Sequence, residues 1–356
     1  MKKKVLMVCE AFGGGVFTYV SQLCNDMVDE FEVYLAYSIR PQTPKNYRDF
    51  LDEKINLIEL RYMGVNNLAN ISNNLKVISE LRQIEETVKP DIIHLHSSVA
   101  GAYGRIAFNG KKNEVIYTPH GYAHVLMGKS LKSSVYKFVE KLLGNRALTL
   151  TCTESEDEEA RKFSKRTSYI ETGVNLNDLA KSLENVNPVN DERFTVFTLG
   201  RATLQKQPQL FNDIAKLVPE ARFVWIGGGE LEYMLDAPNM EVTGWKSRLE
   251  ALALAKGADA FILCSLGEAI AMSLIENMYL KKLVLVSNTM GNKSVVINEE
   301  NGYVCDSALE YASKIKLAME KFPENLVNNA YKSVIEVYNT TVMREKYIKF
   351  YNNLIK

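Results

Sequence analysis

Short apolar runs rich in β-branched residues alternate along this sequence with longer stretches of helical period, and this alternation limits the fold more than any other feature. It is typical of a parallel sheet whose strands are connected by helices. The alternation occurs twice. The expected strands are "KVLMVCE", "EVYLAYS", "INLIEL", "DIIHLHS", "EVIYTPH" and "ALTLTCT" in the first series, and "FTVFTLG", "ARFVWIGGG", "MEVTGW", "ADAFILCS" and "KLVLVSN" in the second. The sequence therefore predicts two doubly wound α/β domains.

The domain boundary is expected in the polar stretch between the two series, at residues 175–193. A chain of 356 residues is also longer than one hydrophobic core usually organises. We expect a first domain at 1–175 and a second at 176–339, followed by a helix at 340–356 whose apolar residues recur at helical spacing. A ligand is expected in a cleft between the domains, against the carboxyl ends of the strands.

Composition and charge narrow the possible classes of function. The formal net charge is zero, which gives no general electrostatic reason to expect nucleic-acid binding. The five cysteines show no Cys-x-x-Cys spacing, and we expect buried, reduced thiols. The N-terminal apolar stretch is too short for a signal peptide and no run of about 18 apolar residues occurs, so we expect a cytoplasmic protein.

Two carboxylates in "SLGEAIAMSLIENM", Glu268 and Glu276, form the first candidate site. Eight positions make a little over two helical turns, so a helix through both would place them on the same side. They follow a buried strand and have apolar neighbours, where an unpaired carboxylate is costly. We expect Glu268 to accept hydrogen bonds from sugar hydroxyls and Glu276 from a ribose diol, with a solvated helix face as the alternative.

Two other strand ends carry candidate anion sites. In "EAFGGGVFTYV" the three glycines open a helix and let backbone amides approach an anion, although Thr18 replaces the last glycine of the dinucleotide fingerprint and disfavours a nicotinamide cofactor. In "LGRATLQKQPQLF", Arg201 and Lys206 stand near a helix start, which suits a diphosphate. A simple tight turn and solvent-exposed cations are the alternatives.

Taken together, these motifs resemble the family 4 glycosyltransferases, a retaining group with the GT-B fold. Glu268 and Glu276 match the Glu-x7-Glu motif of that family, and Arg201 and Lys206 match its diphosphate pair. The segment "FVWIGGGELEYM" looks like its second-domain glycine turn, and "YTPHG" matches its first-domain histidine motif. The resemblance covers nearly the whole chain, and four motifs in this order are hard to reach by chance.

The resemblance implies a GT-B fold, with two Rossmann-like domains facing a central cleft and a C-terminal helix that crosses back to the first domain. It implies donor contacts from the following residues: Glu268 to the sugar, Glu276 to the ribose, Arg201 and Lys206 to the diphosphate, Gly228 in the glycine turn, and the backbone amides of Ile270 and Ala271. It also implies that His120 approaches the sugar from the first domain and that Gly14 and Gly15 line the cleft.

The implied reaction is transfer of a hexosyl or N-acetylhexosaminyl unit from a nucleoside-diphosphate sugar, with UDP as the working expectation, to a saccharide or lipid-linked acceptor in surface polysaccharide synthesis, such as that of capsule or lipopolysaccharide. Arg201 and Lys206 would stabilise the departing diphosphate. No Asp-x-Asp pair occurs in the sequence, so we expect no metal and no other cofactor. No catalytic nucleophile is identified.

Two alternatives remain open at the level of the sequence. A nucleotide-sugar 2-epimerase shares the fold, but we would expect more acidic residues and histidines in its cleft than the four histidines here suggest. A catalytically inactive partner subunit is favoured by Ala269 and Ala271, since the family usually has glycine and often proline at these positions. The presence of all four charged motif residues argues against it.

Three further segments raise separate expectations. His94 and His96 in "DIIHLHSS" are expected to point to opposite faces of their strand, to form no zinc pair, and to be structural or, for His96, cleft-lining. The acidic run "TESEDEEARK" is expected to begin a helix.

The third segment is basic and amphipathic. Residues 111–146 contain seven Lys or Arg and two Glu, with an apolar stripe formed by Leu131, Val135, Phe138 and Leu142. We expect a helix that turns this stripe toward the core. The alternative is that 125–146 docks on the inner face of an anionic membrane and makes the protein peripheral.

Overall fold

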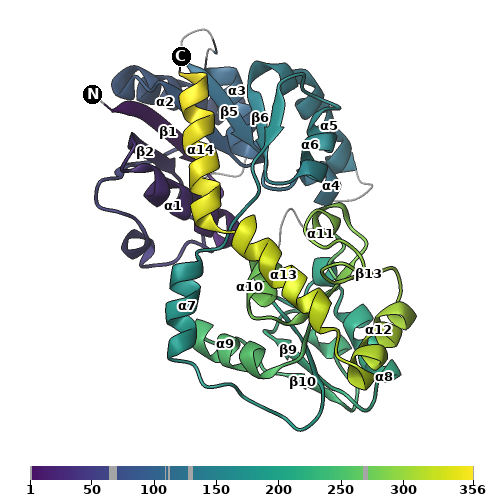
Figure 1. Ribbon diagram of the computed structural model, residues 1–356. Helices are drawn as coiled ribbons and strands as arrows, with labels where there is room; N and C mark the ends of the chain where they lie inside the picture. Colours follow the sequence, from purple (N-terminus) through teal and green to yellow (C-terminus); the bar gives the residue numbers. More distant parts are fainter. Residues whose placement is uncertain are drawn as a thin grey trace. The chain divides into compact units, whose positions relative to one another are not determined.

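The computed structural model describes residues 2–63, 70–108, 110, 113–126, 131–267 and 272–355 (Figure 1). The chain divides into two compact units. The first consists of Met1–Thr172 together with Thr340–Lys356, and the second is Gly173–Asn339. Each unit is a parallel sheet with helices on both faces, as the alternating sequence pattern predicts.

The first unit contains a seven-stranded parallel sheet in the order β3-β2-β1-β4-β5-β6-β7. Its strands are β1 (Lys3–Cys9), β2 (Phe31–Tyr37), β3 (Asn56–Glu59), β4 (Ile92–His96), β5 (Glu114–Thr118), β6 (Leu148–Thr151) and β7 (Thr167–Tyr169). The six predicted strands are all present. The edge strand β7 was not predicted, because it has only three residues and all are half-buried. The strand order reverses between β1 and β4, and open α/β sheets bind ligands at such a point.

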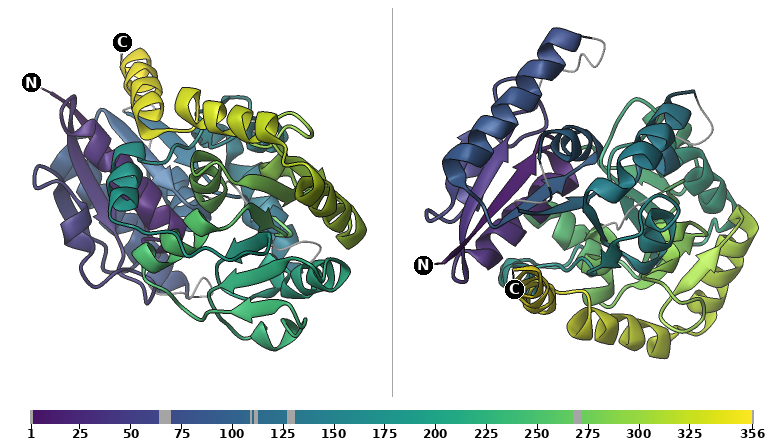
Figure 2. Two further views of the ribbon diagram at one scale, coloured as in Figure 1. Left: turned by 60° about the horizontal axis from the view of Figure 1, so that its bottom comes forward. Right: turned by 90° about the horizontal axis from the view of Figure 1, so that it is seen from above.

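Helices cover both faces of this sheet (Figure 2). They are α1 (Gly14–Met27), α2 (Ile71–Val88), α3 (Ser98–Ala107), α4 (Ala123–Leu126), α5 (Leu131–Leu143), α6 (Glu154–Ala160) and α14 (Thr340–Leu354), with short 3-10 turns at Tyr47–Phe50 and Gly144–Arg146. Alternate residues of β1 face opposite sides: Val5 and Met7 pack with α1 and α14, whereas Leu6 and Val8 pack with α2 and α3. This two-sided burial explains the continuous apolar strands.

The last helix, α14, completes the core of the first unit. Its buried residues Met343, Tyr347 and Tyr351 belong to the same apolar cluster as α1, and the hydroxyls of Tyr347 and Tyr19 are 2.5 Å apart. The predicted return of the C-terminal helix to the first domain is therefore confirmed.

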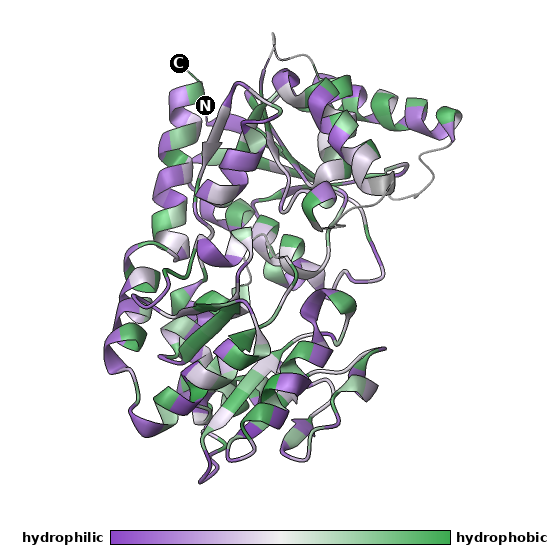
Figure 3. Cartoon of the chain, turned by 90° about the vertical axis from the view of Figure 1, so that its right-hand side faces the viewer, coloured by the Kyte–Doolittle hydropathy of each residue, from purple (hydrophilic) through white to green (hydrophobic). Residues whose placement is uncertain are grey.

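The second unit has a six-stranded parallel sheet in the order β10-β9-β8-β11-β12-β13. Its strands are β8 (Thr195–Leu199), β9 (Arg222–Ile226), β10 (Met240–Val242), β11 (Ala260–Leu263), β12 (Leu283–Ser287) and β13 (Tyr303–Cys305). Its helices are α7 (Leu176–Glu184), α8 (Pro208–Leu217), α9 (Arg248–Gly257), α10 (Met272–Tyr279), α11 (Met290–Lys293), α12 (Ala308–Glu320) and α13 (Glu324–Glu336), with 3-10 turns at Leu204–Lys206 and Glu232–Met234. The five predicted strands are present. Figure 3 shows largely hydrophobic strands within each unit and helices that carry both hydrophobic and hydrophilic residues.

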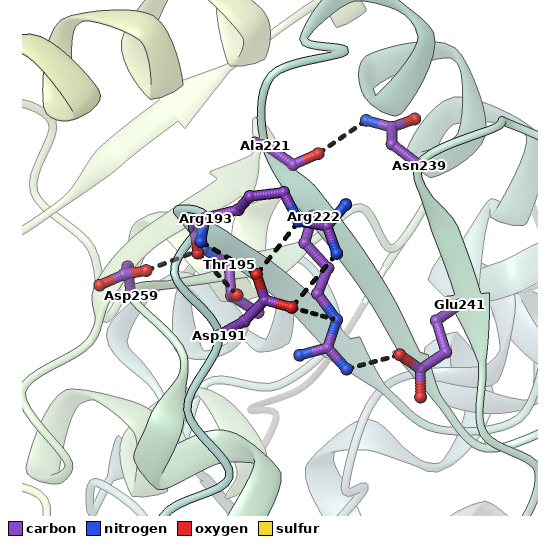
Figure 4. A network of polar contacts seen from close by, with 8 residues as sticks. All are labelled: Asp191, Arg193, Thr195, Ala221, Arg222, Asn239, Glu241 and Asp259. Carbon is purple, nitrogen blue, oxygen red and sulfur yellow. Dashed lines mark hydrogen bonds and ion pairs between the residues drawn. The ribbon is translucent and has the colours of Figure 1, made fainter.

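A network of ion pairs joins the amino ends of the strands in the second unit (Figure 4). Arg222, the first residue of β9, pairs with Asp191 at 3.7 Å and with Glu241 of β10 at 2.5 Å. The backbone N–H of Thr195, which begins β8, donates to Asp259 Oδ2 at 2.8 Å. These contacts lie at the edge of the sheet opposite to the carboxyl ends, so they are structural.

A buried ion pair attaches α5 to the first unit. Arg105 of α3 donates to both carboxylate oxygens of Glu140 at 2.9 and 3.2 Å. The hydroxyl of Tyr117 on β5 donates to the same carboxylate at 3.0 Å, and the guanidinium carbon lies 4.1 Å from the centroid of the Tyr117 ring. Both charges are almost completely buried. The pair therefore fixes which side of α5 faces inward.

The apolar stripe of α5 faces solvent, so the expectation that it faces the core is wrong. The exposed fractions are 58% for Val135, 66% for Phe138 and 66% for Leu142. The side chain of Leu131 lies outside the described residues. The physical reason is the helical period: Glu140 occupies the inward side, so residues two positions away on either side are turned outward.

Replacing Arg105 with Met is expected to lower the free energy of unfolding of the first unit by about 3–5 kcal/mol, because Glu140 would remain buried without its cation. Far-ultraviolet circular dichroism in a urea series measures the loss. Both tryptophans, Trp225 and Trp245, lie in the second unit, so their fluorescence follows that unit separately.

The matched control is Arg166→Met, which breaks the exposed 3.0 Å pair with Glu114. We expect a change of at most about 1 kcal/mol there. Equal losses in the two variants would contradict the role given to the buried pair.

Candidate functional site

In the first unit, polar residues gather where β1, β4, β5 and β6 end. The parallel register pairs Cys9 with His96 and His96 with Thr118, so the loops that follow these strands leave from one edge of the sheet. The predicted residues Gly14, Gly15, His96 and His120 all lie at or just beyond this edge. The structure therefore brings together the first-domain residues that the sequence singled out.

The glycine turn after β1 leaves open space at the start of α1. Gly14 has φ +55, and a Cβ on Gly14 or Gly15 would meet no atom within 4 Å. The buried carboxylate of Glu10 supports the turn: it accepts from the backbone N–H of Ala100 at 3.0 Å and pairs with Arg40 at 3.4 Å. Burial raises the pKa of Glu10, although these partners oppose the shift. The open amide end of a 14-residue helix fits the predicted approach of a ligand.

His120 has an unusual backbone conformation that a buried carboxylate holds in place. Its φ is +54 and that of Gly121 is +93. Glu156 Oε1 accepts from the N–H of Gly121 at 2.7 Å, and Glu156 Oε2 accepts from the N–H of Cys152 at 3.0 Å. Glu156 lies in the first turn of α6, which confirms the helix expected for the acidic run. Strained backbone of this kind concentrates at functional sites.

The ring of His120 belongs to a cluster of three histidines. His120 Nε2 lies 3.0 Å from His96 Nδ1, and His120 Nδ1 lies 3.8 Å from the Cys152 sulfur. The rings of His94 and His96 have centroids 4.1 Å apart, so the expectation that they face opposite sides is wrong. Side chains two positions apart on a strand project to the same face. The side chain of His96, which we expected to line the cleft, is fully buried beside the ring of His120.

All three histidines of the cluster are neutral at physiological pH. Burial lowers the pKa of His94 and of His96 well below the ordinary value, and neighbouring histidines add to the shift. Burial lowers the pKa of His120 to about 3. A neutral imidazole donates one hydrogen bond and accepts one, so the cluster can orient a ligand without carrying charge.

In the second unit, the loops after β8 and β9 interlock through glycine. A Cβ on Gly227, which has φ +134, would lie 2.2 Å from the carbonyl oxygen of Gly200. The N–H of Ala202 donates to the carbonyl of Gly228 at 3.0 Å. Only glycine permits this approach. The predicted glycine turn is therefore built against the loop that carries the predicted cations.

Arg201 and Lys206 stand at the carboxyl end of β8 and before α8. Arg201 pairs with Glu230 of the glycine turn at 3.2 Å, and both side chains are exposed. Lys206 folds back toward Gly200, since its Cε lies 3.6 Å from where a Cβ on Gly200 would stand. Two cations at a helix start provide the charge that a diphosphate requires.

Glu276 lies on α10 and has a partner that the sequence did not indicate. Its Oε1 accepts from Arg248, at the start of α9, at 2.9 Å. The two residues are 28 positions apart, so no local pattern could have revealed the pair. Residues 268–271, which include the predicted site residues Glu268, Ile270 and Ala271, lie outside the described part of the chain.

Within the described residues, no group of three or more His, Cys, Asp or Glu is arranged to hold a metal ion. The expected independence of metal stays a prediction.

Two family models match successive parts of the chain. The model described as Glycosyltransferase Family 4 matches residues 13–178, and the model described as Glycosyl transferases group 1 matches 181–333. The first range holds the glycine turn after β1 and the histidine cluster, and the second range holds Arg201, Lys206 and Glu276. The chain is a GT-B glycosyltransferase.

Similar proteins support this assignment. The glycosyltransferase is 27% identical over 285 residues to the Escherichia coli UDP-Gal:alpha-D-GlcNAc-diphosphoundecaprenol alpha-1,3-galactosyltransferase, covering 72% of this chain and 73% of that protein. Its fold matches the sucrose-phosphate synthase of Thermosynechococcus elongatus with a TM-score of 0.80 at 18% identity over 99% of both chains. It also matches Anabaena HepE in complex with UDP, with a TM-score of 0.75 at 16% identity over 99% of this chain and 100% of the other.

The stability of the glycosyltransferase is expected to fall as the pH drops below about 6.5. The pKa of His94 is lower in the folded state than in the unfolded chain. At pH values between these two pKa values, the unfolded chain therefore binds one more proton than the folded protein. The stabilisation that is present above the unfolded pKa is lost as the pH falls through this range. Replacing His94 with Gln should make the unfolding free energy depend less steeply on pH. Between pH 6 and 4.5, we expect the slope to fall by about 1.4 kcal/mol per pH unit. Urea titrations at several pH values measure both slopes, and identical slopes would mean that folded His94 takes up the proton.

Proposed function

We propose that this glycosyltransferase moves a sugar, with retention of configuration, from a UDP-sugar to a lipid-linked saccharide in the synthesis of a surface polysaccharide. The observation that carries the proposal is the interlocked pair of loops after β8 and β9, which brings Arg201, Lys206 and Gly228 together at the carboxyl edge of the second sheet. The remaining groups take their roles around this diphosphate site.

The diphosphate of the donor is bound by Arg201, Lys206 and the start of α8. As the glycosidic bond breaks, the leaving nucleoside diphosphate gains negative charge, and these two cations stabilise it. Glu230, which pairs with Arg201 in the exposed loop, is replaced by the diphosphate when the donor binds. Protein cations supply the positive charge, so the proposed reaction needs no divalent metal.

The nucleoside is recognised next to α10. Glu276 accepts hydrogen bonds from the ribose hydroxyls, and its ion pair with Arg248 orients the carboxylate. By the resemblance, Glu268 and the backbone amides of Ile270 and Ala271 contact the donor sugar and phosphate. Uridine is supported by two similar proteins: the E. coli relative, which is named as a UDP-Gal galactosyltransferase, and HepE, whose structure is a complex with UDP.

The acceptor is bound by the first unit and is linked to a lipid. The name of the E. coli relative specifies a diphosphoundecaprenol acceptor. The exposed apolar residues of α5 lie beside exposed Lys137 and Lys141, an arrangement that binds anionic membranes. No described helix combines the length and the apolar character needed to cross a bilayer. We place the protein at the cytoplasmic face of the membrane, as a peripheral protein.

Binding of UDP without metal is expected to raise the unfolding free energy of the protein by about 2.7 kcal/mol at a hundred times the dissociation constant. A thermal-shift series with UDP, GDP, ADP and dTDP, with and without EDTA, measures it. Glu276→Ala should lose the shift, because the ribose loses its acceptor.

The control is Glu220→Ala, an exposed carboxylate that lies just before β9, at the amino edge of the same sheet. It should keep the shift. A wild-type protein that none of the four nucleotides stabilises would contradict the donor site and favour an inactive partner subunit.

Removing apolar side chains from α5 is expected to weaken membrane binding. Phe138→Ser combined with Leu142→Ser should reduce partition to vesicles of anionic phospholipid by about tenfold or more, because each side chain loses its burial in the lipid. Co-sedimentation measures the bound fraction. Leu309→Ser, which removes an equally exposed leucine from α12 of the second unit, is the control. Equal binding by all three proteins would exclude α5 as the membrane surface.

A further inference from the structure

The hydrogen bonds around His96 run in one direction, and Met7 sets that direction. His96 Nε2 lies 3.5 Å from the Met7 sulfur. A thioether accepts hydrogen bonds and has no proton to give, so Nε2 of His96 carries the hydrogen. Because His96 is neutral, its Nδ1 has a lone pair and can only accept.

The acceptor Nδ1 of His96 then determines the state of His120. Since the two rings meet at 3.0 Å, His120 Nε2 must carry the hydrogen that is donated to His96. His120 Nδ1 is therefore unprotonated and faces the Cys152 sulfur at 3.8 Å. Burial raises the pKa of Cys152, so it is a thiol at neutral pH and donates its S–H to this nitrogen.

The neighbouring His94 has the same tautomer for an independent reason. The hydroxyl of Thr118 donates to the carbonyl of Leu150 at 2.6 Å, which uses its one proton. His94 Nε2, 2.8 Å from this hydroxyl, is therefore the donor, and His94 Nδ1 accepts from Tyr351 at 2.7 Å. His94 thus supplies an internal standard for the tautomer of His96 and His120.

We infer that His96 is a positioning residue that holds His120 as the Nε2–H tautomer, so that His120 Nδ1 is the acceptor for a hydroxyl of the donor sugar. This inference rests on the proposed function, since it assigns the proton arrangement of the histidine that meets the sugar. A thiol is a weaker donor than an alcohol, so a sugar hydroxyl replaces Cys152 as the partner of Nδ1. In this arrangement His120 orients the sugar and gives it no proton.

Other groups around His120 are consistent with a fixed, neutral ring. Tyr19 packs edge-on against it with centroids 4.6 Å apart, and Tyr347 holds the Tyr19 hydroxyl. Glu156 faces the backbone at Gly121 and Cys152 and makes its hydrogen bonds there. None of these groups offers His120 Nε2 another acceptor.

Nuclear magnetic resonance on protein labelled with 15N-histidine tests the tautomers directly. The chain has only four histidines, so long-range proton–nitrogen spectra can be assigned with one variant each. We expect His94, His96 and His120 to show the Nε2–H pattern and to keep it from pH 8 to 5.5. An Nδ1–H pattern for His120, or its protonation in this range, would overturn the inference.

Two variants of His96 test the consequence for catalysis. In His96→Asn the amide oxygen stands one bond beyond Cγ, where Nδ1 stands in histidine, so the acceptor is kept. In His96→Leu it is removed. We expect His96→Leu to lower kcat by about tenfold or more with a smaller change in KM for the donor, and to give His120 a mixed tautomer. His96→Asn should restore most of kcat and the single tautomer.

The possible outcomes separate this inference from the proposed function. Equal losses of kcat in both variants, with an unchanged His120 tautomer, would show a merely structural role for His96 and overturn the inference. If His96→Leu does not fold, the wild-type spectra and His96→Asn still decide. Wild-type protein with the expected tautomers that transfers no sugar would refute the proposed function and, with it, the role of Nδ1 toward a sugar, while the hydrogen-bond chain would stand.

Discussion

The parallel pairing of the strands is the constraint on which the rest of this structure depends. Because β1, β4 and β5 run in the same direction and in register, their polar continuations meet at one edge of a sheet that is otherwise apolar. Polar groups buried there must satisfy one another. Glu10, His96 and Glu156 do so by holding the backbone or ring of a neighbouring loop. The rigidity of the site thus follows from the cost of burying polar atoms.

The same cost explains the orientation of α5. A helix usually turns its apolar stripe inward, but here a carboxylate and a guanidinium take the inward side and neutralise each other, with a tyrosine as a third partner. Once Glu140 is inside, Phe138 and Leu142 are outside. The exposure of the apolar stripe is therefore a consequence of the buried ion pair.

The sequence predicted most of the architecture because strands and helices are encoded locally. Eleven predicted strands are present, and among the described residues only the three-residue edge strands β7 and β13 were missed. Local motifs also singled out Arg201, Lys206 and His120 as candidate site residues, and their roles stay predictions. The pairs Arg248–Glu276 and His96–His120 could not be predicted, because folding brings together segments far apart in sequence. The stripe of α5 was misjudged, because periodicity reveals a helix face without saying which way it turns.

The place of α14 has a consequence for the order in which the chain folds during synthesis. The core of the first unit needs Met343, Tyr347 and Tyr351, which leave the ribosome only after the whole second unit has been made. The second unit begins and ends at neighbouring points, since Val174 donates to the carbonyl of Tyr338 at 3.0 Å. It is thus a continuous insertion that can complete its own core first. During synthesis, the N-terminal part of the first unit therefore lacks α14. Its histidine cluster stays without the contact between His94 and Tyr351 until this last helix has been made.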